Sequence, residues 1–139
     1  MVDQNLVTAK LSELSERIQR IRQHRPETAA GYKEAPEVLD LVSFNLMLAV
    51  QLCLDVASHL IADEGWPPAP TLAEHFTRLR EQGVLTRDTE SALAKATGLR
   101  NVVAHTYAKV EPAKIHEAAT RGLTDLERFS HEVSRWLGR

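Results

Sequence analysis

Four long segments of the chain carry apolar residues at intervals of three and four, the spacing that forms one face of an α-helix. They cover about residues 5–23, 36–62, 86–109 and 112–137. A short fifth helix is predicted from Thr71 to Gly83, because Thr71 and Glu74 match a capping box and a glycine ends the pattern. The stretch 27–34 reads as a loop. The pattern therefore predicts an all-α, up-and-down bundle of four main helices and one short helix.

The segment 36–62 is apolar on nearly every side, which is unusual for a surface helix. We expect it to be the central helix of the bundle and to need cover on more than one face. A small bundle offers few neighbours for this, so the pattern favours a homodimer. The clearly polar positions between Val38 and Ile61 are few: Asp40, Ser43, Asn45, Gln51, Asp55, Ser58 and His59.

Two of these polar residues, Gln51 and Asp55, are four positions apart and are therefore neighbours on one face of the helix. A buried carboxylate needs a hydrogen-bond donor, and Arg100 is a candidate. The pair is expected either to support a functional site or to be a structural contact without chemistry.

Composition places the chain among ordinary soluble globular proteins. Its 139 residues are 43% hydrophobic and 26% charged, which suits one domain spanning 1–139. The net charge of −2 argues against general attraction to nucleic acid but leaves room for a local basic cleft. The single cysteine, Cys53, lies in an apolar run and predicts a buried thiol. No signal segment is visible at residues 1–10, so we expect a cytoplasmic protein with no membrane association.

The segment 86–109 has an unusual outer face. Its apolar stripe, predicted to face the core, contains Leu85, Ala92, Ala96, Leu99, Val103 and Val110. The opposite face, where Lys and Glu would be ordinary, carries Ala94, Gly98, Asn101, His105 and Ala108. Small residues allow another backbone or a ligand to approach closely. We therefore expect this face to form an interface or a cleft.

Near the end of this segment, Arg100 and His105 provide a permanent cation and an imidazole that titrates near neutral pH. Familiar phosphate-loop, dinucleotide-binding, serine-hydrolase and zinc-protease motifs are missing, and the six histidines are scattered, so we predict neither a metal nor a cofactor. An imidazole and a guanidinium suffice for metal-independent RNA cleavage, in which the 2′-OH attacks the adjacent phosphate. The expected products are a 2′,3′-cyclic phosphate and a 5′-OH.

The spacing of these two residues favours a two-fold arrangement. Five positions on a helix separate side chains by about 140° around the axis, so one helix does not easily aim both at one phosphorus atom. In a homodimer, Arg100 of one chain could meet His105 of the other. An Arg-x₄-His spacing alone is weak, since about half a match is expected by chance in this composition.

The longer pattern Arg100-Asn101-x-x-x-His105-x-Tyr107 resembles the R-N-x-x-x-H-x-Y signature of HepT-like toxins in the HEPN superfamily. The resemblance extends from the first predicted helix to the last. It implies a homodimeric HEPN-like bundle with metal-independent ribonuclease activity, in which the Arg and His of both subunits meet in a cleft. It also implies a partner antitoxin, an MntA-like minimal nucleotidyltransferase, that silences the toxin by attaching AMP to the signature tyrosine, here Tyr107.

On this reading Arg100 stabilises the transition state, His105 is the general acid or base, and Asn101 positions phosphate or imidazole. Gln51 and Asp55 support the site. Two alternatives remain. The chain could be a catalytically silent HEPN module that binds a nucleotide or serves as a subunit of a nucleotidyltransferase complex. It could also be a purely structural helical dimer, in which Arg100 pairs with Asp55.

Overall fold

Six helices make up the part of the chain that the computed structural model describes, residues 2–105 and 110–139, with the backbone alone at His105. No strand occurs in these ranges, so the all-α prediction is confirmed. The helices are α1 (Gln4–His24), α2 (Gly31–Glu34), α3 (Pro36–Glu64), α4 (Leu72–Glu81), α5 (Arg87–His105) and α6 (Pro112–Leu137).

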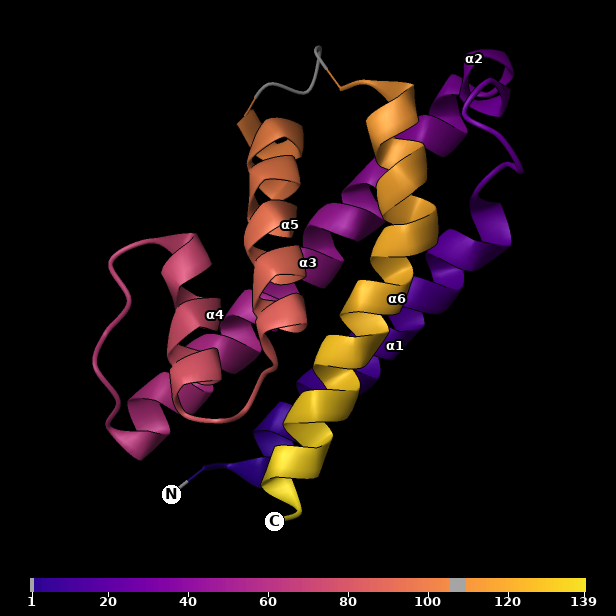
Figure 1. Ribbon diagram of the computed structural model, residues 1–139. Helices are drawn as coiled ribbons and strands as arrows, with labels where there is room; N and C mark the ends of the chain where they lie inside the picture. The colour runs from indigo at the N-terminus through magenta and orange to yellow at the C-terminus, as the bar shows by residue number, and fades with distance from the viewer. Residues whose placement is uncertain (1, 106–109) are drawn as a thin grey trace.

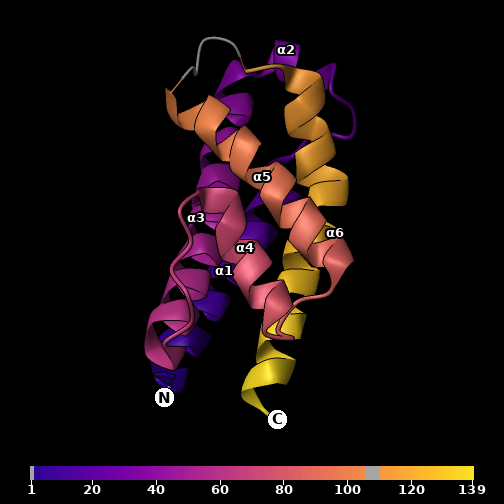
Figure 2. The same ribbon diagram turned by 60° about the vertical axis from the view of Figure 1, so that its left-hand side comes forward.

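The helices run up and down, as predicted. Helix α3 returns antiparallel to α1, and α6 returns antiparallel to α5 (Figure 1). Helix α4 packs against both α3 and α5, on the side of the bundle away from α1 (Figure 2). The five predicted helices match α1, α3, α4, α5 and α6 to within a few residues over the described ranges.

Helix α2 corrects the prediction of a loop over 27–34. It is one turn long and contains Tyr32, whose side chain is almost fully buried. The ring meets the imidazole of His116 edge-on at 6.2 Å between centroids. Burial of the aromatic ring stabilises this turn. A single buried residue produces no periodic pattern of apolar positions, so the sequence did not predict the helix.

Helix α3 is the core of the bundle. Helices α1, α4, α5 and α6 all pack against it, and 13 of its 29 residues are buried. The expectation that α3 needs cover from a second chain stays a prediction. Phe44, which is 53% exposed, is the main apolar residue left uncovered on α3.

Two features of α3, the state of its cysteine and its high hydropathy, are consistent with burial inside the bundle. Cys53 is fully buried, as predicted, and desolvation raises the pKa of its thiol. By length and composition α3 could cross a membrane, with a mean hydropathy of 1.7 over its most apolar window. However, 61% of that window is buried inside the protein, which is typical of a core helix.

The linker between α3 and α4 is anchored to the C-terminal helix. Trp66 meets Trp136 edge-to-face, with 5.6 Å between ring centroids. Thr71 then begins α4 as predicted, because its hydroxyl accepts a hydrogen bond from the backbone N–H of Glu74 at 3.3 Å. Gly65 and Gly83 end α3 and α4 at positive φ, a conformation that other residues rarely adopt.

The N-terminus of α5 is capped by a carboxylate from α6. Glu132 is 6% exposed, and one of its oxygens accepts the backbone N–H of Thr86 at 2.8 Å. Its other oxygen accepts the hydroxyls of Thr86 and Thr89 at 3.1 and 2.9 Å. A negative charge at this end of a helix interacts favourably with the helix dipole. Glu132 therefore fixes the start of the helix that carries Arg100.

Replacing Glu132 with Ala should destabilise the protein by about 1–3 kcal/mol, because the buried hydroxyl of Thr89 and the two donors of the exposed Thr86 lose their acceptor. Urea denaturation followed by circular dichroism measures this change. The matched control is Glu117→Ala on the same helix, an exposed position where the change should stay within about 0.5 kcal/mol. Equal stabilities of the two variants would contradict the capping role.

Candidate active site

Arg100 projects from α5 onto the surface of α3, where neutral amides fix its guanidinium. Its Nη2 donates to Oε1 of Gln51 at 3.0 Å, and its Nη1 donates to Oδ1 of Asn101 at 3.0 Å. The side chain is half-buried, and its Nε is buried with no partner among the described residues. Arg100 is therefore tethered in place while its charge is not neutralised by these contacts.

Gln51 links Arg100 to Asp55. Its Nε2 donates to Oδ1 of Asp55 at 2.9 Å, one turn further along α3. Because the amide N–H₂ is used in this way, the amide oxygen must point toward Arg100. The predicted pairing of Gln51 with Asp55 is confirmed. The suggestion that Arg100 itself pairs with Asp55 is corrected, since Gln51 lies between them.

Asp55 has a partner that the sequence did not reveal. Lys10 of α1 places its Nζ 3.6 Å from Oδ2 of Asp55. Both side chains are partly exposed, 27% for Lys10 and 37% for Asp55. Lys10 sits at an ordinary polar position of its helical pattern, and only the antiparallel packing of α1 on α3 brings it to Asp55. No local pattern could have found it.

The outward face of α5 is partly as predicted. Gly98 and Asn101 are exposed, whereas Ala94 is half-buried. The side chain of His105 and the whole of Tyr107 and Ala108 lie outside the described residues. The structure thus brings together Arg100, Asn101, Gln51 and Asp55, and the roles expected of His105 and Tyr107 stay predictions.

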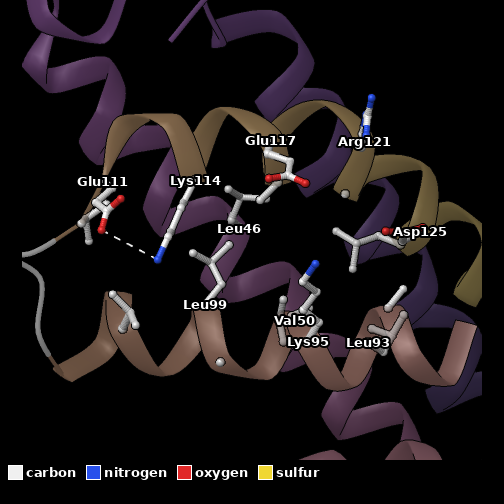
Figure 3. A pocket seen from close by; sticks show the side chains of 18 residues that line it. Leu46, Val50, Leu93, Lys95, Leu99, Glu111, Lys114, Glu117, Arg121 and Asp125 are labelled. Carbon is white, nitrogen blue, oxygen red and sulfur yellow. Dashed lines mark ion pairs between the residues drawn. The ribbon is translucent and has the colours of Figure 1, made fainter.

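The apolar stripe predicted for α5 is divided between the core and an open groove. Leu85 and Val103 are buried, as expected. Ala92, Ala96, Leu99 and Val110 are half-buried and line a groove of about 810 Å³ between α5 and α6. Figure 3 shows Leu46 and Val50 of α3 behind this groove. Helices α5 and α6 are therefore in contact over only part of their length.

The edges of this groove carry charges of both signs. Lys95 and Lys114 line it together with Glu111, Glu117 and Asp125, and Lys114 lies 3.8 Å from Glu111 (Figure 3). Arg121 also lies at the edge, with the end of its side chain pointing away from the groove. Such a mixture does not attract a polyanion, unlike a cluster of cations. Across the described ranges, no three His, Cys, Asp or Glu side chains gather as a metal site would require.

The sequence is similar to those of two nucleases. The chain is 24% identical over 125 residues to the mRNA nuclease HepT of Shewanella oneidensis, covering 90% of this chain and 93% of that protein. It is also 24% identical over 92 residues to the tRNA nuclease HepT of Aphanizomenon flos-aquae, which covers 66% of this chain and 63% of that protein.

A solved structure shares the fold. It is the tri-AMPylated Shewanella oneidensis HEPN toxin in complex with the MNT antitoxin, with a TM-score of 0.87 and 24% identity. The match covers 97% of this chain and 99% of that one. The model of the family described as Ribonuclease HepT-like matches residues 14–133, which include α3, α5 and the whole Arg100–Tyr107 signature. The chain therefore belongs to the HepT-like ribonuclease family.

Proposed function

We propose that this chain is the toxin of a HepT/MntA-type toxin–antitoxin system and acts as a metal-independent RNA endonuclease. The observation that carries the proposal is the state of Arg100 within the family signature: two neutral amides tether it, and these contacts leave its charge unneutralised. A cation prepared in this way suits the charge that develops on a phosphate during cleavage. The relatives named as mRNA and tRNA nucleases support the same reaction class.

The reaction needs only groups of the protein and the RNA itself. His105, as general base, takes the proton of a ribose 2′-OH, and the resulting oxygen attacks the adjacent phosphorus. Arg100 stabilises the added negative charge on the phosphoryl oxygens. The P–O5′ bond then breaks, and the leaving oxygen receives a proton from a general acid. The products are a 2′,3′-cyclic phosphate and a 5′-OH.

The first test is cleavage in EDTA. The parent protein should cut RNA and leave cyclic-phosphate ends, and His105→Ala should lower the rate by about 100-fold or more. Gel analysis with end-group chemistry measures both. His131→Ala, an exposed histidine on α6, is the matched control and should retain the parental rate. A His105→Ala protein that folds and cuts at the parental rate would remove His105 from the mechanism.

We propose further that the active form is a homodimer. Phe44 is 53% exposed and lies two helical turns from Gln51 on the same face of α3. An exposed aromatic side chain beside the Arg100 site suits contact with a second copy. A two-fold partner would also let Arg100 of one chain meet His105 of the other.

Mixing two inactive variants tests this crossed arrangement. When Arg100→Ala and His105→Ala subunits exchange, half of the dimers are mixed and each has one intact site, so about a quarter of the parental activity should return. Sedimentation confirms the dimer in the same samples. Inactive mixed dimers would exclude crossed sites, and a monomer at micromolar concentration would contradict the dimer itself.

The proposed partner in the cytoplasm is an MntA-like nucleotidyltransferase that attaches AMP to Tyr107. The solved structure of an AMPylated HEPN toxin with its antitoxin supports this regulation. In this sequence Tyr107 is seven positions after Arg100. An added adenylate would bring a phosphate charge that competes with RNA for the nearby cation.

Tyr107→Phe keeps the aromatic ring but removes the acceptor hydroxyl. We expect this variant to cut RNA as the parent does, to gain no adenylate mass on incubation with the transferase and ATP, and to resist silencing. Intact-mass spectrometry measures the modification, and Tyr32→Phe provides the matched control with a buried tyrosine. Equal adenylate additions to Tyr107→Phe and the parent would place the modification on another residue.

A further inference from the structure

We infer that Lys10 is a positioning residue of the active site, which keeps Asp55 from pairing with Arg100 and so leaves the charge of Arg100 available to RNA. The inference rests on the proposed function, because it concerns the same arginine. Helix α1 carries no residue of the family signature, and Lys10 connects this helix to the site.

Asp55 has both carboxylate oxygens engaged. Oδ1 accepts the amide of Gln51 at 2.9 Å, and Oδ2 faces the ammonium group of Lys10 at 3.6 Å. The negative charge of Asp55 is thus compensated from α1. Without Lys10, the carboxylate would keep one neutral donor and lose its positive partner.

Arg100 is the cation positioned to replace it. Its guanidinium already reaches Oε1 of Gln51, and Gln51 in turn touches Asp55. Arginine and carboxylate form two parallel charge-assisted hydrogen bonds, which are stronger than a bond to a neutral amide. A change of Gln51 and Asp55 rotamers would exchange the present Arg100–Gln51 contact for an Arg100–Asp55 ion pair. Such a pair would neutralise the charge that the phosphate needs.

The observed arrangement avoids this outcome because Asp55 and Arg100 have different partners. Lys10 neutralises Asp55, and the partners of Arg100 among the described residues are the neutral side chains of Gln51 and Asn101. Asp55, which is held by Lys10, accepts the N–H of the Gln51 amide, and this orients the amide oxygen of Gln51 toward Arg100. Lys10 therefore acts through Asp55, and not by touching the substrate.

A double-mutant experiment distinguishes these two roles. Lys10→Met should lower kcat for RNA cleavage by about 10-fold or more, corresponding to about 1.4 kcal/mol of transition-state stabilisation. Lys10→Arg, which preserves the charge, should recover most of the loss. In the background of Asp55→Asn, which keeps an oxygen acceptor for Gln51 but removes the negative charge, Lys10→Met should have no further effect on kcat.

The matched control is Lys33→Met, which removes an exposed cation of α2 that takes no part in these contacts. It should leave kcat unchanged and raise KM by at most the small amount expected for one surface charge. If Lys10→Met lowers activity by the same factor with Asp55 or Asn at position 55, Lys10 contacts RNA directly and the inference is overturned. An unchanged kcat for Lys10→Met overturns it as well.

A structural measurement separates this inference from the proposed function. Nuclear magnetic resonance of the arginine side chains, assigned with Arg100→Lys, should show a changed Arg100 Nε–H signal in Lys10→Met and its return toward the parental position in Lys10→Met/Asp55→Asn. An identical Arg100 signal in all of these proteins refutes the inference even if RNA is cleaved. If the parent cuts no RNA, the proposed function fails, and the signal still decides whether Lys10 controls the partner of Arg100.

Discussion

Covering the long apolar helix α3 is the constraint on which the rest of the molecule depends. Apolar surface must leave water, and at 29 residues α3 is too long for one neighbour to cover it. Helices α1, α2, α4, α5 and α6 contact it, and the positions they leave exposed or half-buried include Phe44, Gln51 and Asp55. Polar residues are tolerated at these positions because α1 and α5 bring charged side chains to them. The candidate active site is therefore a consequence of how α3 is covered.

Local patterns in the sequence were sufficient for much of this architecture. Helical periodicity identified five of the six helices of the described chain, and the Thr71 cap was visible as a capping box. The same patterns indicated that Gln51 and Asp55 would be neighbours, because both lie on one helix four positions apart. Interactions within one element are encoded in spacing, and spacing is visible in a single sequence.

Interactions between distant elements were not visible. Lys10 meets Asp55 across 45 positions of sequence, and Glu132 meets Thr86 across 46. Nothing in the spacing of one helix states which residue of another will face it. Hydropathy likewise counts the apolar positions of α3 but says nothing about how many neighbouring helices can reach them. The short helix around Tyr32 was not predicted for a related reason, since its stability comes from burial of a single aromatic ring.

The cap on α5 has a consequence for when this protein can become active during its synthesis. Glu132 lies on α6, the helix that follows α5 in the chain, yet it fixes the beginning of the helix that carries Arg100. A ribosome-bound chain that lacks α6 has α1 and α3 available to pair, but α5 lacks the Glu132 carboxylate and part of its packing surface. Arg100 should therefore reach its final position only once α6 has been made and has packed against α5. The order of the helices thus delays the assembly of the candidate site until α6 follows α5.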